Sequence, residues 1–443
     1  MPTTFTLAIA PGSLPLVGHG WRLMRDPMAF LESLSDHGDL VEIRVGPQRA
    51  YVPCHPELLR RVLHDDSTFD KGGPFFNRAR DVVGNGLSSC PHQEHRRQRR
   101  LLQPSFSRTQ LRQYGSVMEH EVSALTGAWQ SGQVVEAYPV FFDLFLRVVT
   151  RTLFSAHLDE DTMEEIHRTC EVAVDGIVPR LFMPKSLQRI PLRANRRYQE
   201  ALSGFHRVVD RIIADYRLDG RDHGDLLSAL LRTRDDDGRG LDQAEIHDQV
   251  ITMIIGGSET SAATLCWALH LVTRNPEIEH RLRDEVMAVL GGRSAGYDDL
   301  PRLELTGRII TEALRLYPPV WLTTRITTAP VQLAGRQLPL GSTIVFAPSA
   351  VHRNRASYCR PSDFDPDRWL PERSADLPRG AYAAFGAGAR RCIGDSYGTT
   401  ESTIALATIM SSWRVRSTER TDIRPQPMTV VYRPRRLQLQ LAR

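Results

Sequence analysis

The segment Phe385-Gly386-Ala387-Gly388-Ala389-Arg390-Arg391-Cys392-Ile393-Gly394 is the most specific feature of this sequence. Its glycines at 386, 388 and 394 let the backbone fold closely around a sulfur, so that amide groups can donate to it. A helix expected over residues 398–410 directs its positive end at a thiolate of Cys392. A free cysteine is most often a plain core residue, but a plain core excludes charges such as Arg390 and Arg391. The segment therefore indicates a cysteine thiolate that serves as a ligand.

A second informative segment is the apolar-rich run of residues 246–273. Asp242 and Glu245 have the spacing of a helix capping box, which places the start of a helix just before this run. At ~1.5 Å per residue the expected helix is about 45 Å long. A helix of that length has to cross the protein.

The middle of this helix reads Gly256-Gly257-Ser258-Glu259-Thr260-Ser261. Two adjacent glycines cost about 2 kcal/mol relative to alanine, so a buried helix needs a reason to accept them. Close helix packing accounts for one glycine but not for the whole group. A groove beside Thr260 and Glu259 accounts for the group, because a hydroxyl and a carboxylate can deliver protons there.

Both segments resemble those of the cytochrome P450 family. The first matches the family's cysteine-loop pattern, F-x-x-G-x-R-x-C-x-G, at every fixed position, and the second resembles its A/G-G-x-D/E-T oxygen-binding motif. The resemblance implies the cytochrome P450 fold, mainly α with a minor β region, in which a long central helix crosses over a buried haem. It also implies haem b as cofactor, O2 as co-substrate, Cys392 as the axial ligand of the haem iron, and Thr260 with Glu259 as the catalytic pair. The cofactor-binding residues that it implies are Cys392, His95, Arg99, Arg325, Arg390, Gly256, Gly257, Phe385 and Gly394.

Two further motifs follow in the family's order. Glu312 and Arg315 lie three residues apart, which is weak evidence alone because the same spacing recurs elsewhere in the chain. With Arg368 they resemble the family's structural Glu-Arg-Arg network, in which loss of one partner leaves an uncompensated buried charge. Where the family commonly has W-x-x-x-R, this sequence has His95 and Arg99. Histidine can still donate to a carboxylate, so we expect both residues to contact a haem propionate.

The pattern of apolar residues, turns and motifs predicts a single domain over residues 1–443. Residues 1–70 are expected to form an N-terminal strand region. Residues 71–317 are expected to be helical and to contain the oxygen-binding helix at about 242–274. Residues 318–443 are expected to hold β segments, the cysteine loop and the haem-proximal helix.

Finer predictions follow from the spacing of apolar residues. Alternation predicts a strand pair over residues 41–52, closed around Gly46-Pro47, and a final strand pair over residues 428–441. Three- and four-residue spacing predicts several long helices. These helices are expected around residues 111–129, 138–154, 163–178 and 196–217.

The composition excludes several classes of protein. Apolar residues make up 41% and charged residues 24%, as in an ordinary globular chain, and a net charge of +4 over 443 residues gives no support to nucleic-acid binding. Lys71 and Lys185 are the only lysines, an arginine bias that suggests a bacterial source. The six cysteines lack paired spacing, and residues 1–20 resemble neither a signal peptide nor a membrane anchor, so we expect a cytoplasmic protein without disulfides.

The expected substrate pocket is almost entirely apolar, which suits an enclosed hydrocarbon. Several segments, such as His19-Gly20-Trp21 and Val320-Trp321-Leu322, resemble those of actinobacterial sesquiterpene-oxidising P450s. This resemblance implies hydroxylation and further oxidation of a terpene methyl group, with pentalenene taken to its alcohol and aldehyde in antibiotic biosynthesis. The pocket residues that it implies are Phe75, Phe76, Val178, Phe182, Met253, Trp321 and Val430.

The family also implies partners. Because the chain has no motif of a fused flavin domain, we expect an acidic ferredoxin, served by a ferredoxin reductase, to dock on a monomer near Arg96, Arg100 and Arg391. Two alternatives stay open. One is oxidation of another terpene, a macrolide or a fatty acid, and the other is a haem-binding sensor without turnover.

Overall fold

The computed structural model describes residues 5–155, 158–183, 185–235, 237–419 and 423–443, apart from the side chains of Phe182, Lys185 and Arg189. Its helices are α1 (Gly20–Arg25), α2 (Pro27–Ser33), α3 (Pro56–His64), α4 (Gly73–Val83), α5 (His92–Leu102), α6 (Arg108–Gly127), α7 (Ala137–Leu153), α8 (Glu160–Asp175), α9 (Ile177–Phe182), α10 (Lys185–Arg189), α11 (Arg193–Asp219), α12 (Leu226–Arg232), α13 (Gln243–Arg274), α14 (Pro276–Leu290), α15 (Glu304–Leu316), α16 (Pro348–His352), α17 (Pro371–Ser374) and α18 (Asp395–Ser412). The strands are β1 (Leu7–Ile9), β2 (Leu40–Val45), β3 (Gln48–Pro53), β4 (Phe69–Asp70), β5 (Val134–Glu136), β6 (Thr323–Thr327), β7 (Val331–Leu333), β8 (Arg336–Leu338), β9 (Thr343–Phe346), β10 (Arg414–Ser417) and β11 (Gln438–Ala442).

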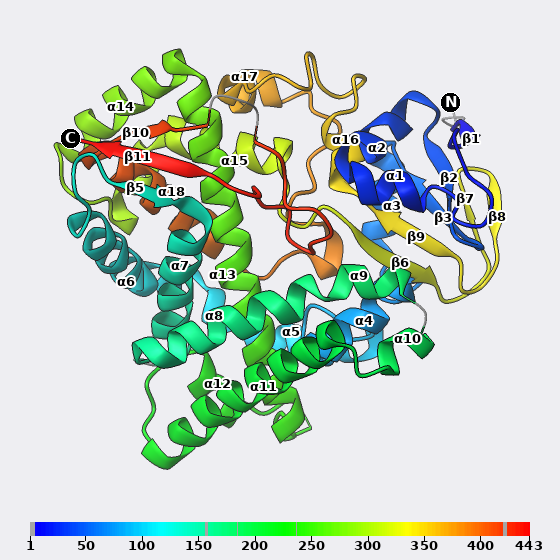
Figure 1. Cartoon of the computed structure of the whole chain (residues 1–443), viewed down its shortest axis with the longest axis horizontal. Helices are drawn as coiled ribbons and strands as arrows, with labels where there is room; N and C mark the ends of the chain where they lie inside the picture. Colours follow the sequence, from blue (N-terminus) through cyan, green and yellow to red (C-terminus); the bar gives the residue numbers. More distant parts are fainter. Residues whose placement is uncertain (1–4, 156–157, 184, 236, 420–422) are drawn as a thin grey trace.

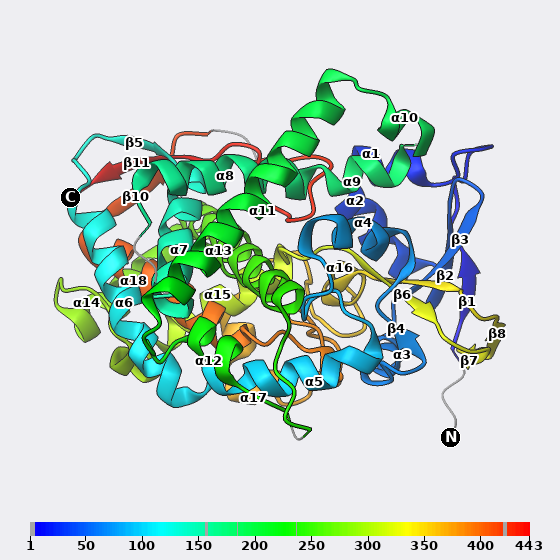
Figure 2. The ribbon, with the colours of Figure 1, turned by 90° about the horizontal axis from the view of Figure 1, so that it is seen from below.

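Helices fill one side of the molecule and the largest sheet lies at the other end (Figure 1). That sheet has the order β1-β2-β3-β9-β6-β4, and its β2–β3 hairpin confirms the strand pair predicted over residues 41–52. The predicted mainly α architecture with a minor β region is thus confirmed. Seen from below, α5 lies on the opposite face of the molecule from α10 (Figure 2). Helix α11 packs mainly against α8.

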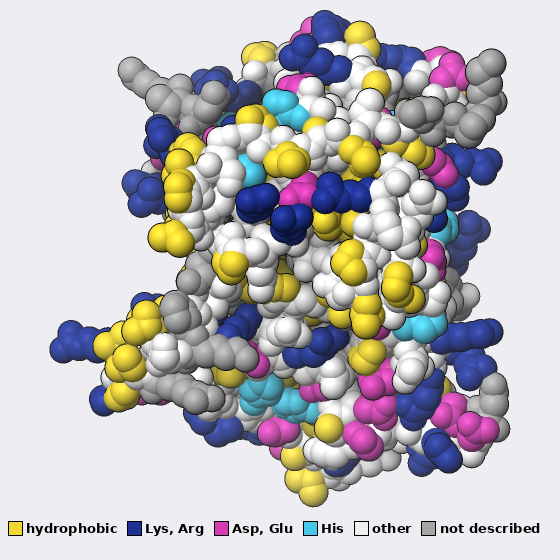
Figure 3. All heavy atoms as spheres, turned by 90° about the vertical axis from the view of Figure 1, so that its right-hand side faces the viewer, with side chains coloured by type: hydrophobic (Ala, Val, Ile, Leu, Met, Phe, Trp, Pro, Cys, Tyr) yellow, Lys and Arg dark blue, Asp and Glu magenta, His cyan; other side chains and the backbone are white. Residues whose placement is uncertain are grey.

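The surface at the sheet end mixes apolar and charged side chains (Figure 3). Its exposed apolar residues include Leu7, Ile9, Leu14 and Leu16, of which Leu16 is 93% exposed. Basic and acidic side chains stand between the apolar ones rather than leaving one continuous apolar face (Figure 3). No helix in the described ranges is both long enough and apolar enough to cross a membrane.

The central helix α13 organises the helical side. Asp242 accepts from the backbone amide of Glu245 and Glu245 accepts from that of Asp242, so the predicted capping box is confirmed. From Ile246 to Val272 most of its side chains are buried, and α13 packs against α7, α15 and α18. These contacts hold its middle turn in a fixed place inside the protein.

The C-terminal segment differs from the prediction. Instead of a strand pair over residues 428–441, β11 pairs with β10 and β5, and the residues before it make only isolated bridges such as Val431 with Val320. Pro425, Pro427 and Pro434 interrupt this segment, and proline cannot donate to a strand ladder. The segment therefore crosses the molecule as an irregular strap.

Candidate active site

The cysteine loop is a tight backbone fold that ends at the start of α18. The amide of Cys392 donates to the carbonyl oxygen of Phe385 at 2.9 Å, which closes the loop. Gly388 has φ +67°, and a Cβ there would lie 2.4 Å from the carbonyl oxygen of Leu63 in α3. Burial raises the pKa of the Cys392 thiol, whereas a hydrogen bond from the Gly394 backbone lowers it. The loop thus presents a sulfur whose negative form needs a positive partner.

This sulfur faces an internal cavity of about 380 Å³. The cavity lies between the cysteine loop, the middle of α13, helix α4 and the segment that leads into β6. Its wall contains most of the predicted site residues. They are Cys392, Thr260, His95, Arg99, Arg325, Arg390, Gly256, Gly257, Phe385, Gly394, Phe75, Phe76, Met253 and Val430.

The two adjacent glycines of α13 have separate physical reasons. A Cβ on Gly257 would lie 2.8 Å from Cγ2 of Val149, so this glycine lets α7 approach closely. A Cβ on Gly256 would meet no atom within 4 Å, so this glycine keeps space open in the cavity wall. The hydroxyl of Thr260 donates to the Gly256 carbonyl oxygen at 2.6 Å. Both predicted explanations therefore hold, each for one glycine: close helix packing for Gly257 and an open groove for Gly256.

Glu259 does not lie on the cavity wall with its neighbour Thr260. It is completely buried on another face of α13, where the Cys170 thiol donates to its Oε1 at 3.7 Å. Its Oε2 has no hydrogen-bond partner among the described residues. Burial raises the pKa of Glu259 to about 8, against the charge of Arg433, which lowers it. The side chain is therefore an uncharged acid at neutral pH.

A group of cations lies at one edge of the cavity. Arg390 is fully engaged, because it donates to Asp66 at 3.1 Å, to Asp70 at 2.9 Å and to the Cys90 carbonyl at 2.8 Å. Arg325 differs, since Nε and Nη1 of this buried guanidinium have no hydrogen-bond partner in the described part of the chain. Burial lowers the pKa of Arg325 to about 10. A buried guanidinium with two unsatisfied nitrogens indicates room for an anion beside it.

Three more side chains complete this edge. Burial lowers the pKa of His95 to about 3, so its imidazole is neutral and has one N–H to donate. Arg99 donates to the carbonyl oxygen of Arg391 and to Gln103, which ties α5 to the cysteine loop. Lys71 also lines the cavity, where burial, together with Arg325 and Arg390, lowers its pKa well below the ordinary value. Sequence motifs missed Lys71, although it is one of only two lysines in the chain.

The structure brings Glu312, Arg315 and Arg368 together in a buried network. Arg315 donates to both carboxylate oxygens of Glu312, and Arg368 donates to Oε1 at 3.4 Å. Trp369 adds a bond from its indole to Oε2 at 2.8 Å, a member that the sequence motifs did not identify. Arg315 also donates to the carbonyl oxygens of His352 and Pro361, so the network fixes the chain leading to the cysteine loop.

Two predicted pocket residues, Trp321 and Val178, stand apart from the cavity wall. Trp321 packs in a second core cluster near the sheet, where its indole donates to the Thr429 carbonyl at 3.0 Å, and Val320 and Thr323 line the cavity instead. Val178 is buried but not on the wall, because the turn at Gly176 directs Val174 and Ile177 there. The side chain of Phe182 lies outside the described residues.

Comparisons with known proteins agree with this geometry. A model of the cytochrome P450 family matches residues 10–441. The chain is 52% identical to pentalenene oxygenase of Streptomyces avermitilis, over 99% of this chain and 98% of that protein. It is 46% identical to cyclooctatin synthase of Streptomyces melanosporofaciens, over 95% of this chain and 92% of that protein. The solved heme domain of cytochrome P450DA superposes with a TM-score of 0.89 at 25% identity, covering 99% of this chain and 98% of that one.

Proposed function

Because the chain belongs to the cytochrome P450 family, a family of haem b monooxygenases that use O2, we propose that Cys392 supplies the thiolate ligand of its haem iron. The observation that carries this proposal is that the Cys392 sulfur, Arg325 and the hydroxyl-bearing turn of α13 all line one cavity. Two nitrogens of Arg325 have no hydrogen-bond partner among the described residues. The chain is thus an oxidoreductase, and the residues of the cavity determine what it oxidises and how protons arrive.

The residues at the cavity edge fit the two carboxylates of haem b. Arg325 would donate to a propionate with the two nitrogens that lack partners, and the Lys71 amine is a further hydrogen-bond donor in the cavity wall. Neutral His95 would donate its single N–H, and Arg99 would hold the loop that carries Cys392. Arg390, whose nitrogens are engaged by Asp66, Asp70 and Cys90, would act mainly by fixing this edge.

Bound haem supplies activation of O2 for insertion of one oxygen atom into a C–H bond. Thr260 lines the cavity and would hold a proton at Oγ1, which now donates to the Gly256 carbonyl. Glu259, protonated at neutral pH, would replace that proton from behind the helix. Gly256, one turn before Thr260, keeps the cavity wall beside this hydroxyl free of side-chain atoms.

We propose a terpene hydrocarbon, with pentalenene as the first candidate, as the substrate. The substrate side of the cavity is formed mainly by apolar residues such as Phe75, Phe76, Met253 and Val430, which bind by burial rather than by polar contacts. One relative is named for pentalenene, and another is a cyclooctat-9-en-7-ol 5-monooxygenase at 44% identity, a name that describes an alkene alcohol. The products would be the alcohol and then the aldehyde of the oxidised methyl group.

We further propose that a ferredoxin, reduced by its reductase in the cytoplasm, donates electrons to the monomeric enzyme. Arg96 and Arg100 are exposed on α5, and the bond from Arg99 to the Arg391 carbonyl joins this helix to the cysteine loop. A basic surface therefore adjoins the cysteine side of the cavity, as docking of an acidic partner requires. Changing Arg96 to Glu would slow reduction by ferredoxin without altering substrate binding.

The test of the substrate is a spectral titration of the purified haem protein with pentalenene. We expect a saturable change in the haem absorption spectrum, and product analysis with ferredoxin and reductase should then show the alcohol and aldehyde. The reduced carbon monoxide complex should show a thiolate-type spectrum. If it does and the protein still gives no response to pentalenene, the haem site is intact and pentalenene is not the substrate. Macrolide and fatty acid ligands, titrated in parallel, decide between the remaining substrate classes.

A further inference from the structure

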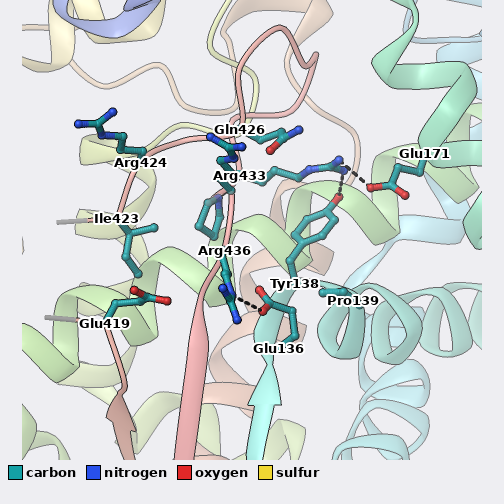
Figure 4. Close-up of a pocket in the computed structure, with 12 residues that line it drawn as sticks. Glu136, Tyr138, Pro139, Glu171, Glu419, Ile423, Arg424, Gln426, Arg433 and Arg436 are labelled. Carbon is teal, nitrogen blue, oxygen red and sulfur yellow. Dashed lines mark hydrogen bonds and ion pairs between the residues drawn. The ribbon is translucent and has the colours of Figure 1, made fainter. Parts of the chain in front are cut away.

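A second pocket, of about 700 Å³, opens beside Tyr138, Glu171 and Arg433. It is formed by the first turn of α7, by α8 and by the proline-interrupted strap before β11 (Figure 4). Its lining is strongly polar and carries both signs of charge. The charged lining residues are Glu136, Glu171, Glu419, Arg424, Arg433, Arg435 and Arg436.

Arg433 differs from the other arginines of this pocket because it is buried, with 4% of its surface exposed. Its side chain points toward Tyr138 and Glu171 (Figure 4), donating to them at 3.0 Å and 2.8 Å. It also donates to Asp175 at 2.7 Å, and its guanidinium lies 4.4 Å from the centre of the Tyr138 ring. One arginine therefore joins two carboxylates of α8 to the start of α7.

Glu259 lies on the inner side of this group. Its contact is Cys170, which directly precedes Glu171 on α8, so one turn of α8 touches both the buried acid and the Arg433 cluster. Glu259 is completely buried, and its Oε2 has no hydrogen-bond partner among the described residues. An unpaired carboxyl oxygen in such a place requires either a water molecule or a function.

The charges of the cluster act on Glu259 in opposite directions. Arg433 lowers the pKa of Glu259, whereas Asp175 and Glu171 raise it, and burial has the largest effect of all. Tyr138 and Cys170 are the other titratable groups that face it, and burial keeps both of them protonated. Burial raises the pKa of Asp175 itself to about 6, much closer to neutral pH than the pKa of an ordinary aspartate.

We propose that this pocket is the solvent port through which Glu259 regains its proton, and that Arg433 and Asp175 are the positioning residues that govern that step. The inference rests on the proposed role of Glu259 as the acid behind Thr260. Insertion of one oxygen from O2 into a C–H bond, with the second leaving as water, consumes two electrons from ferredoxin and two protons. Asp175 does not itself line the port, but it is bonded to Arg433, which does. Water that reaches this cluster from the port supplies each proton to Asp175, which passes it to the Glu259 carboxylate through bridging water.

The direct test follows the protonation of Glu259 by infrared spectroscopy of the protein at rest. Its carboxyl absorption, identified as the difference between the parent protein and Glu259→Gln, is titrated from about pH 5 to about pH 10. We expect Arg433→Gln to raise the midpoint by about one pH unit and Asp175→Asn to lower it by about as much. Arg433→Lys, which keeps the charge, should stay near the parent value.

A matched control comes from the same pocket. Arg436 also lines it but is 64% exposed and lies 3.8 Å from Glu136, so Arg436→Gln should leave the midpoint unchanged. In turnover, Asp175→Asn should lower the product formed per electron pair about tenfold, with an increased solvent isotope effect, while Arg436→Gln behaves as the parent.

Two failures are distinguishable. If Glu259→Gln itself leaves the product formed per electron pair unchanged, the proposed role of Glu259 is wrong, and the proposed proton supply through the port is wrong with it. If Glu259→Gln impairs coupling but neither Arg433→Gln nor Asp175→Asn moves the carboxyl midpoint, Glu259 keeps its proposed role as the acid. The proposal that this pocket is its solvent port is then rejected. Should Arg433→Gln fail to fold, Asp175→Asn, which removes an acid and keeps the arginine, still decides the question.

Discussion

Arg315 holds Glu312 by two parallel hydrogen bonds, of 2.8 Å and 2.6 Å, and neither side chain has any exposed surface. Such a pair cannot lose one partner without leaving a buried charge. We expect Arg315→Leu to lower the free energy of unfolding by about 3 to 5 kcal/mol and to reduce haem incorporation sharply. Urea unfolding and the haem-to-protein ratio measure the two effects.

The chain offers a matched control with the same three-residue spacing. Glu57 and Arg60 form an ion pair at 2.7 Å, but both side chains are well exposed. Arg60→Leu should change the unfolding free energy by less than about 1 kcal/mol. Equal losses in the two variants would show that burial is not what makes the Glu312 pair important.

Alanine substitutions at the two adjacent glycines of α13 should change the stability of the protein in opposite directions. Gly257→Ala places a methyl 2.8 Å from Val149 and should destabilise the protein by about 1 to 3 kcal/mol. Gly256→Ala meets no atom and should stabilise the helix by about 1 kcal/mol, yet it narrows the cavity and should weaken substrate binding. Thermal unfolding and substrate titration of both variants check this; a destabilised Gly256→Ala protein would contradict the division of roles.

Replacement of Cys392 by Ser should abolish turnover and the thiolate-type carbon monoxide spectrum. The reason is that the sulfur faces the cavity and no other described cysteine lines it. Cys359 is exposed and does not line the cavity, so Cys359→Ser is the control and should keep both properties. Full activity of Cys392→Ser would overturn the assignment of the ligand.

Removal of the Thr260 hydroxyl should separate electron use from product formation. Thr260→Ala leaves the cavity intact but removes the group expected to pass a proton, so electrons are consumed while product falls about tenfold or more. Thr264 lines the same cavity one turn further along α13, and Thr264→Ala should remain coupled. Unchanged coupling in Thr260→Ala would exclude Thr260 from proton transfer.

The raised pKa of Glu259 makes stability depend on pH. Its folded pKa is about 8 against an ordinary value of 4.5, so the folded state binds the proton more tightly than the unfolded state. The stability linked to that proton is complete below about pH 4.5 and is lost as the pH rises through about 8. Urea unfolding at about pH 6 and about pH 9 should show a smaller difference in Glu259→Gln than in the parent protein.

Local signals made much of this fold predictable. The capping box at Asp242 set the start of α13, and the glycines at 386 and 388 identified a loop that folds around Cys392. The Glu312 network could be predicted because its members follow one another in the family's order. These features depend on neighbours in sequence, where spacing carries the information.

What the sequence did not reveal depends on the tertiary fold. Trp321 directly follows the cavity residue Val320, but its indole turns into the core near the sheet. Glu259 adjoins Thr260 on one helix, yet successive helical residues point about 100° apart, and only packing decides which of them faces the cavity. Lys71 and Arg433 belong to no motif, and their importance comes from burial among charges brought from distant segments.

The strap before β11 carries Val430 in the wall of the cysteine cavity and Arg433, three residues later, in the charged pocket. A short length of irregular backbone therefore joins the surface that fits the substrate to the group that governs proton return. Any substitution that enlarges the cavity by shifting this strap also disturbs the proton supply. Enzymes of this lineage that adapt to a bulkier substrate through the strap should first waste reductant as peroxide, and should recover efficiency only through compensating changes in α8.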